Sequence, residues 1–173
     1  MRGILVTLSK SPFAKRIRCL VLAATGGILP AQSPAPSLGK FYIVGMGTAP
    51  DLITVRAQKV IARADVLIGE EGSFEKDWAD VAKGKEIWQW PHNFRRLYGV
   101  DPATLKDADQ RALAESLDRT RRQLIEKIRT AVAVGKVVAC LEGGDPMMYG
   151  MTLFLELLPA GVPSQIVPGI GAF

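Results

Sequence analysis

Short runs of consecutive apolar residues alternate with stretches of helical periodicity along most of this chain. The run 40–45 (KFYIVG) ends in glycine, and the run 65–69 (DVLIG) follows residues 54–64, where apolar positions recur at helical spacing. Continuous apolar runs are typical of strands buried on both faces of a parallel sheet. The order strand, glycine-rich turn, helix, strand therefore predicts a βαβ unit with a right-handed crossover.

The second half of the chain predicts a long helix and two further strands. The helical pattern runs from Pro102 to about Val134, with Gly135 as the residue that ends it. Four apolar residues share one stripe of this helix: Leu113, Leu117, Leu124 and Ile128. Strands are predicted at 136–141 and 164–167, separated by a loop at 142–150 and a helix at about 151–158, whereas residues 70–102 are less regular. We therefore predict an α/β fold with an open, mainly parallel sheet and helices on both faces.

Residues 1–38 differ in composition from the rest and form a leader before a domain at 39–173. Residues 1–38 contain five basic residues and no acidic ones. All five basic residues precede a short apolar stretch from Cys19 to Ala31, and a proline-rich linker follows that stretch. This order is typical of a secretory signal, and the stretch is too short for a standard membrane span. The alternatives are a disordered N-terminal extension or a start codon assigned too far upstream.

The positive charge of the chain belongs to this leader. The whole sequence has 22 basic and 17 acidic residues, a net charge of +5, so residues 39–173 carry 17 of each sign. Nucleic-acid binding depends on a basic surface, and the balanced body predicts no nucleic-acid partner. Cys140 lies in an apolar run without metal-ligand spacing around it, which favours a core position and no metal site.

Three glycine-bearing loops follow predicted strands, at 45–51, 143–150 and 169–173. Ligands bind at the carboxyl ends of strands in open parallel sheets, and glycine lets backbone approach a ligand closely. Pro50 stands where the dinucleotide pattern G-x-G-x-x-G has its third glycine, so we do not expect NAD.

Four segments together resemble the tetrapyrrole methylase family. They are 42–54 (YIVGMGTAPDLIT), 64–69, 141–150 (LEGGDPMMYG) and 167–173 (VPGIGAF). That family includes the uroporphyrinogen-III and precorrin methylases of the sirohaem and cobalamin pathways. The resemblance implies two α/β domains with S-adenosylmethionine in the cleft between them. This chain resembles the first domain and the entry to the second, so the second domain is expected to be missing from it.

The resemblance also implies which residues bind the methyl donor. They lie in the three loops: Gly45, Gly47 and Pro50; Gly143, Gly144, Asp145, Pro146, Met148 and Tyr149; Gly169, Gly171 and Ala172. The first loop departs from the family after Gly47, where Thr48 and Ala49 replace the family's proline and glycine. Met147 and Met148 are expected to line the flat faces of the donor, with core filling as the alternative.

Glu70 stands where the uroporphyrinogen-III branch has a proposed base, and the alternative is a solvated side chain at a strand end. Arg95 and Arg96 follow Trp88, Trp90 and His92 and could pair with the propionates of a tetrapyrrole, because arginine binds carboxylates bidentately. The alternative is an exposed loop pinned to the core by its tryptophans.

The leading hypothesis is methyl transfer from S-adenosylmethionine to a tetrapyrrole intermediate, a step that depends mainly on positioning. The alternatives are a methylase of RNA or protein with the same fold, or a non-catalytic exported module that binds a tetrapyrrole. The donor implies a cytoplasmic location, whereas a true signal at 1–31 would imply an exported or periplasmic one. The resemblance also implies a homodimer.

Overall fold

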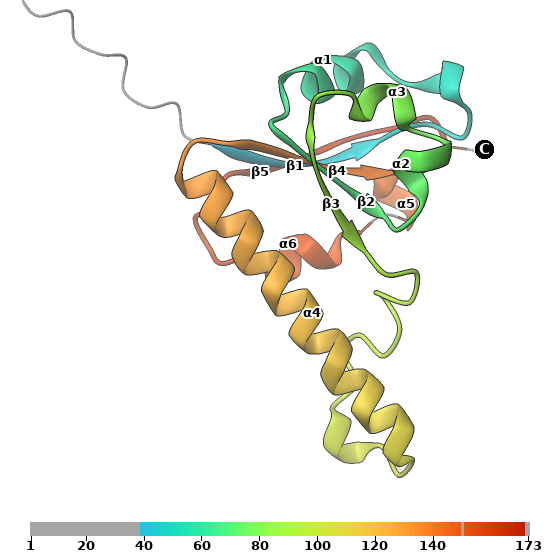
Figure 1. The fold of residues 1–173 in the computed structure, drawn as a ribbon, viewed down its shortest axis with the longest axis vertical. Helices are drawn as coiled ribbons and strands as arrows, with labels where there is room; N and C mark the ends of the chain where they lie inside the picture. The colour runs from blue at the N-terminus through green and yellow to red at the C-terminus, as the bar shows by residue number, and fades with distance from the viewer. Residues whose placement is uncertain (1–38, 150, 172–173) are drawn as a thin grey trace, which may run out of the picture. The chain divides into compact units, whose positions relative to one another are not determined.

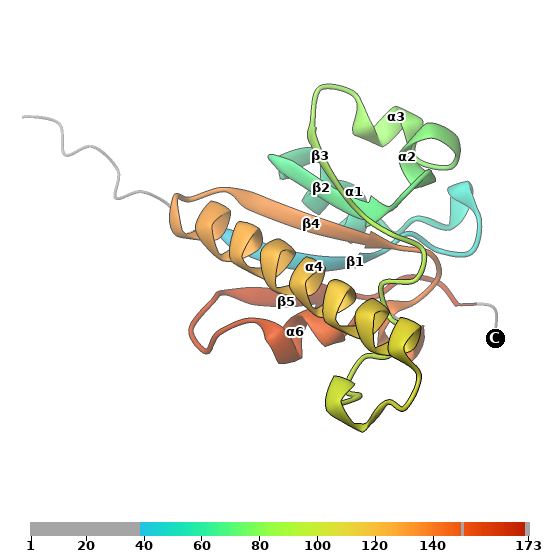
Figure 2. The same ribbon diagram turned by 60° about the horizontal axis from the view of Figure 1, so that its bottom comes forward.

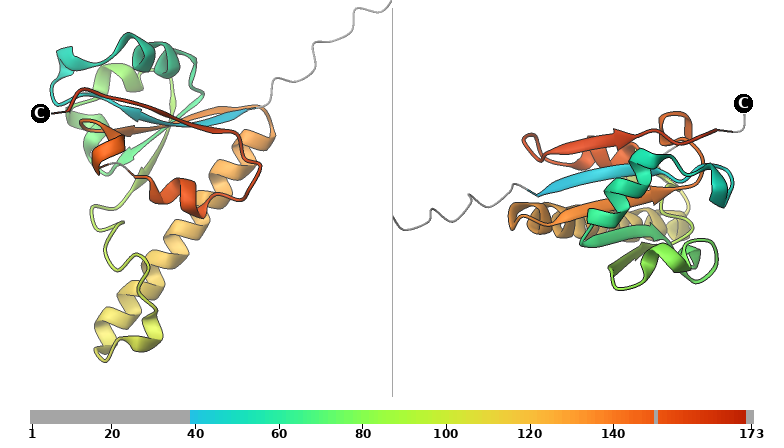
Figure 3. Two further views of the ribbon diagram at one scale, coloured as in Figure 1. Left: turned by 180° about the vertical axis from the view of Figure 1, so that it is seen from behind. Right: turned by 90° about the horizontal axis from the view of Figure 1, so that it is seen from above.

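The computed structural model describes residues 39–149 and 151–171, which form an α/β domain around one sheet. The sheet has five strands in the order β3-β2-β4-β1-β5, and every pairing is parallel. This order can be followed from above in Figure 3. The strands are β1 (Lys40–Gly45), β2 (Val66–Glu70), β3 (Glu86–Trp90), β4 (Val137–Glu142) and β5 (Ser164–Val167). The predicted fold class is confirmed.

Helices cover both faces of the sheet because the strands are apolar on both sides (Figure 1). One face packs against α1 (Val55–Arg63) and the short helices α2 (Ser73–Lys76) and α3 (Ala79–Ala82). The other packs against α4 (Ala108–Ala133) and α6 (Leu153–Leu157), as Figure 2 shows. Along β1 the fully buried Ile43 packs on the face covered by α4 and α6, and its neighbour Val44 packs on the face covered by α1 to α3, as the alternation of a strand requires.

The long helix begins later than the sequence suggested, and the prediction that it starts at Pro102 is wrong. Pro102–Thr104 form a separate 3-10 turn whose first N–H groups are capped by Asp101. The helix starts after Asp107, whose carboxylate accepts hydrogen bonds from Asp109 N (2.8 Å) and Gln110 N (3.1 Å). A proline at the first position of a short turn gives the same local signal as one that opens a long helix.

The predicted end of this helix is confirmed. Gly135 has φ of 88°, a conformation that residues with a Cβ rarely adopt, and its N–H bonds to Val132 O. The N–H of Lys136 then bonds back to Ala131 O at 3.0 Å, which turns the chain into β4. Leu117, Leu124 and Ile128 are buried on the predicted stripe.

Residues 70–102, which showed less regularity, contain the edge strand β3. Its buried side chains alternate with polar ones, so Trp88 and Trp90 join the core while Gln89 is exposed. The short helix α5 (Pro146–Tyr149) lies inside the segment predicted as a loop. Residues 1–38, and with them the proposed leader, lie outside the described residues.

Candidate functional site

The three glycine loops meet at the carboxyl edge of β4, β1 and β5, which are adjacent strands. A Cβ added to Gly169 would lie 2.9 Å from the Cα of Gly45 and closer still to the carbonyl oxygen of Gly144. A Cβ on Gly45 would lie 2.6 Å from the Cδ of Pro146 and would overlap Gly169. Side chains have no room at these two positions, because the backbones of the loops are in contact.

A pair of backbone hydrogen bonds joins the first two loops. Gly47 N donates to Gly144 O at 3.3 Å, and Gly144 N donates to Gly47 O at 2.8 Å. Both glycines have positive φ, 79° and 74°, which lets the loops bend away from the strands before they meet. Gly143 differs from them, since its φ is ordinary and a Cβ there would meet nothing within 4 Å. The loops thus form a rigid frame with an opening beside Gly143.

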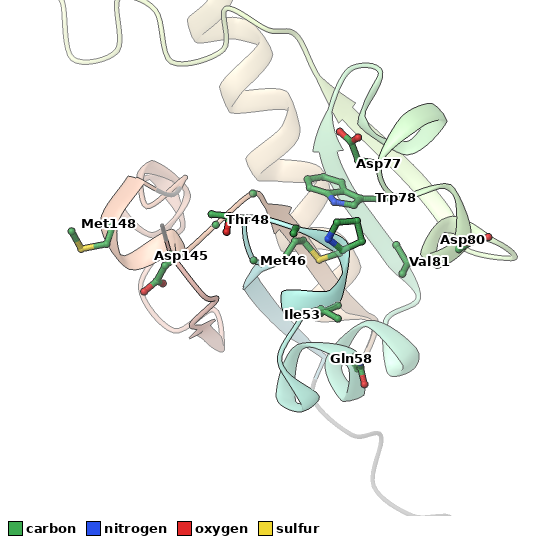
Figure 4. Close-up of a pocket in the computed structure, with 16 residues that line it drawn as sticks. Met46, Thr48, Ile53, Gln58, Asp77, Trp78, Asp80, Val81, Asp145 and Met148 are labelled. Atoms are coloured by element: carbon green, nitrogen blue, oxygen red, sulfur yellow. The ribbon is translucent and has the colours of Figure 1, made fainter. Parts of the chain in front are cut away.

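A pocket of about 750 Å³ lies against this frame. Figure 4 shows Met46 and Thr48 of the first loop between two groups of residues, with Asp145 and Met148 on one side and Trp78 on the other. The lining from the three loops comprises Met46, Gly47, Thr48, Ala49, Pro50, Gly143, Gly144, Asp145, Met148 and Gly171. The lining from the chain after the first loop and from α1 to α3 comprises Ile53, Gln58, Asp77, Trp78, Asp80 and Val81.

The predicted donor-binding residues fall into three groups. Seven of them line the pocket: Gly47, Pro50, Gly143, Gly144, Asp145, Met148 and Gly171. Gly45, Pro146 and Gly169 form the contacts behind the pocket wall. The side chain of Tyr149 and all of Ala172 lie outside the described residues. Met147 and Met148 are 60% and 59% exposed, so the alternative that they fill the core is wrong.

The pocket lining contains no lysine or arginine within the described residues, and it does contain carboxylates. Asp145 accepts a hydrogen bond from Met147 N at 3.0 Å and so also shapes the start of α5. Asp80 is paired with Lys83, which leaves Asp77 and Asp145 as the acidic contribution. Such a lining disfavours phosphate-rich nucleotides and suits a ligand with positive charge.

The chemistry of this pocket fits S-adenosylmethionine, which carries a sulfonium and an ammonium group. Its volume is in the range typical of small-molecule sites. Trp78, Met46 and Ile53 offer apolar surface for a flat base, and the glycine loops offer backbone N–H and C=O groups. In the described residues no group of His, Cys, Asp or Glu is arranged to hold a metal ion.

A second pocket of about 310 Å³ adjoins the first, and Trp78 and Gly143 line both. Four charged or titratable side chains enter it: Glu70, His92, Arg95 and Glu142. His92 Nδ1 lies 3.0 Å from Glu70 Oε1, and Arg95 Nη2 lies 3.4 Å from Glu142 Oε2. Arg95 also donates from Nε to Met151 Sδ at 2.9 Å.

Glu142 is the buried member of this group, with a side chain only 12% exposed. Its pKa is raised to about 7, mainly because burial disfavours the ionised form. The charge of Arg95 and the N–H of Met151 oppose this rise, and the charge of Glu70 adds to it. Glu70 itself is 46% exposed. The two carboxylates therefore lie in different environments at the same pocket.

The residues predicted to bind the substrate are separated. Arg95 lines the second pocket, whereas Arg96 is exposed and lines neither pocket. Trp88 and Trp90 pack in the core, as the alternative of a loop pinned by its tryptophans requires. The segment is also held by Arg121 of α4, which is 1% exposed and donates to the carbonyl oxygens of Phe94 (2.7 Å) and Arg96 (2.6 Å).

Sequence reasoning missed Glu142, Trp78 and the residues that α1 and α3 contribute to the pockets. Trp78 belongs to the segment without a regular pattern, and only the folded chain brings it beside the first loop. Glu142 stands directly before the Gly143–Gly144 pair at the end of an apolar run, and this charged residue at a strand end was an available signal. Within the described residues no helix is both long and apolar enough to cross a membrane.

Comparisons with known proteins agree with this geometry. The family model described as Tetrapyrrole (Corrin/Porphyrin) Methylases matches residues 40–173. The uroporphyrinogen-III C-methyltransferase of Bacillus subtilis (strain 168) is 33% identical over 140 residues, which cover 77% of this chain and 45% of that protein. A siroheme synthase of Pseudomonas putida (strain W619) is 29% identical over 177 residues, which cover 99% of this chain and 34% of that protein.

A solved structure shows the same fold. The X-ray structure of a cobalt precorrin-4 methyltransferase, a cobalamin biosynthetic enzyme, superposes with a TM-score of 0.55 at 27% identity and covers 82% of this chain and 50% of that one. The chain thus spans half or less of the length of these relatives. The match extends over most of the chain and includes all three glycine loops, and the chain belongs to the tetrapyrrole (corrin/porphyrin) methylase family.

Proposed function

We propose that residues 39–173 form the donor-binding part of a methyltransferase that moves a methyl group from S-adenosylmethionine to a tetrapyrrole intermediate. The observation that carries this proposal is the contact of three glycine loops at one strand edge, beside a pocket of about 750 Å³ without basic residues among its described lining. Membership in the tetrapyrrole methylase family supports the donor and the class of acceptor.

The role of this chain is to hold and orient the reactants. The bound donor supplies an electrophilic methyl group on a sulfonium. The backbone of Gly143 would bind its polar parts beside the paired Gly47 and Gly144, and Trp78 would offer an apolar surface to its base. Because displacement at a methyl group needs an in-line approach, fixed positions account for most of the acceleration.

The acceptor and the cellular location follow from the same proposal. The balanced charge of residues 39–173 supports a small-molecule acceptor over RNA. Since S-adenosylmethionine is a cytoplasmic cofactor, we propose a cytoplasmic enzyme. A homodimer stays a prediction from the family resemblance.

Isothermal titration of the full-length protein with S-adenosylmethionine and S-adenosylhomocysteine tests the proposal. The informative variant is Gly143→Val, because Gly143 lines the pocket and a Cβ added there would meet no protein atom within 4 Å. We expect the wild type to bind both compounds and the variant to bind at least about tenfold more weakly, a loss of ~1.4 kcal/mol.

The control is Ala133→Val, which adds the two methyl groups of valine on the exposed end of α4, just before the start of β4. It should bind like the wild type. Absence of heat from both compounds with the wild type would remove the donor from the proposal, and unchanged binding by Gly143→Val would remove this pocket.

A further inference from the structure

The second pocket lies where an acceptor would meet the donor. Gly143 and Trp78 line both pockets, so ligands in the two would be separated only by the width of these residues. The second pocket is lined by the ends of β2 and β4 and by the segment after β3, and it opens beside the half-exposed Arg95. A group held there lies next to the donor pocket.

The size of this pocket suits one ring of a larger acceptor. A volume of about 310 Å³ is at the lower limit of ligand sites, too small for a four-ring macrocycle as a whole. The apolar walls are Trp90, Phe94 and Met151, and the polar groups are on the remaining sides. One pyrrole ring would enter while its carboxylate substituents stay near Arg95 and solvent.

We infer that Glu142 is the base that removes the proton from the methylated ring in this pocket. The inference rests on the proposed function. In the transfer, an electron pair of the ring forms the new C–C bond, and the S–CH₃ bond breaks with its electrons on sulfur. The ring is then cationic and regains neutrality when a carbon- or nitrogen-bound proton passes to the Glu142 carboxylate, the electrons of that bond returning to the ring.

The surroundings of Glu142 fit this role better than those of Glu70. Glu142 is buried in the second pocket and directly precedes Gly143, which lines both pockets, whereas Glu70 is half exposed and held by His92 at 3.0 Å. The groups that face Glu142 are Arg95 from the segment after β3, Glu70 from β2 and the Cys140 thiol from β4, whose Sγ lies 4.0 Å from Oε1. A carboxylate with a pKa of about 7 is a stronger base than an ordinary one and still ionises at neutral pH.

The release of the proton also has a route in the structure. Glu70 and His92 line the same pocket and are 46% and 75% exposed, so both connect its interior with solvent. Glu142 would return to its ionised form through these groups before the next turnover.

The test measures methyl transfer from S-adenosylmethionine to uroporphyrinogen III by the full-length protein and its variants. For Glu142→Gln we expect kcat to fall by ~100-fold or more, the usual contribution of a positioned base, while the affinity for S-adenosylhomocysteine changes by less than about twofold. Glu142→Asp should restore part of kcat. The log of kcat for the wild type should rise with pH up to about 7 and then level off, as the base loses its proton.

Two variants complete the test. Glu115→Gln, on the exposed side of α4, should behave like the wild type. Glu70→Gln should lose less kcat than Glu142→Gln. If Glu142→Gln keeps kcat, or if Glu70→Gln loses more, the inference is overturned and the proposed function stands. If the wild type transfers no methyl group to uroporphyrinogen III or to a precorrin, the proposed function is overturned and the inference with it.

Discussion

Glu142 should reduce the stability of the folded protein at neutral and alkaline pH, and its replacement by glutamine should increase that stability. The pKa of Glu142 is about 7 in the folded protein against 4.5 for an unperturbed glutamate. Between these values the folded protein binds the proton more tightly than the unfolded chain does. The free energy of unfolding therefore falls as pH rises from about 4.5 to 7 and stays lowered above pH 7.

The magnitude follows from the two pKa values. One pKa unit corresponds to about 1.4 kcal/mol, so ionised Glu142 costs the folded state about 3 kcal/mol above pH 7. Glutamine carries no charge and keeps an oxygen that can accept from Met151 N and from Arg95. The Glu142→Gln variant should thus be more stable than the wild type by about 2–3 kcal/mol at pH 8 and by less than about 1 kcal/mol at pH 5.

Urea unfolding at a series of pH values from 5 to 9 measures this difference, and Glu115→Gln is the control for loss of an exposed carboxylate. Other titrating groups are common to both proteins and cancel in the comparison. A Glu142→Gln variant that is less stable at pH 8, or one whose advantage is the same at pH 5, would refute the reasoning. A gain in stability together with a loss of kcat would be typical of a residue kept for function.

Three further predictions concern the frame around the pockets. Gly169→Ala should lower the free energy of unfolding by ~3 kcal/mol or more, because the added Cβ overlaps Gly45 and Gly144; a melting temperature equal to that of the wild type would contradict this. Arg121→Met should cost about 2–4 kcal/mol in urea unfolding, since two carbonyl oxygens lose their buried donor; the reasoning fails if the loss is under ~1 kcal/mol. Asp107→Ala should cost about 1 kcal/mol through the lost cap of α4, seen as faster amide exchange in its first turn; unchanged exchange there would count against the assigned helix start.

The sequence predicted the strands and the glycine loops well because both depend on local patterns. Apolar runs that end in glycine correspond to β1 and closely to β2, and Gly45 and Gly169 lie in contact as convergence of the loops requires. The edge strand β3 was missed because one of its faces is polar and its tryptophans suggested a loop. The start of α4 was misplaced because Pro102 begins a turn of its own.

The second pocket was beyond prediction for a different reason. Its carboxylates, Glu70 and Glu142, come from strands β2 and β4, and the edge strand β3 carries His92 and Arg95 to the same end of the sheet. Taken alone, each of these polar residues at or after the end of a strand would be expected to be solvated. Only the parallel pairing of the strands aligns their ends, and only the folded chain brings Met151 and Arg95 beside Glu142.

Arg121 connects the edge of the second pocket to α4. Its guanidinium holds the backbone at Phe94 and Arg96, and Arg95 stands between these two residues. A one-residue shift of α4 would move this guanidinium by about 100° around the helix axis and release the loop. Transplanting the second pocket into another α/β scaffold would therefore require the middle of this helix, in its original register, as well as the residues that line the pocket.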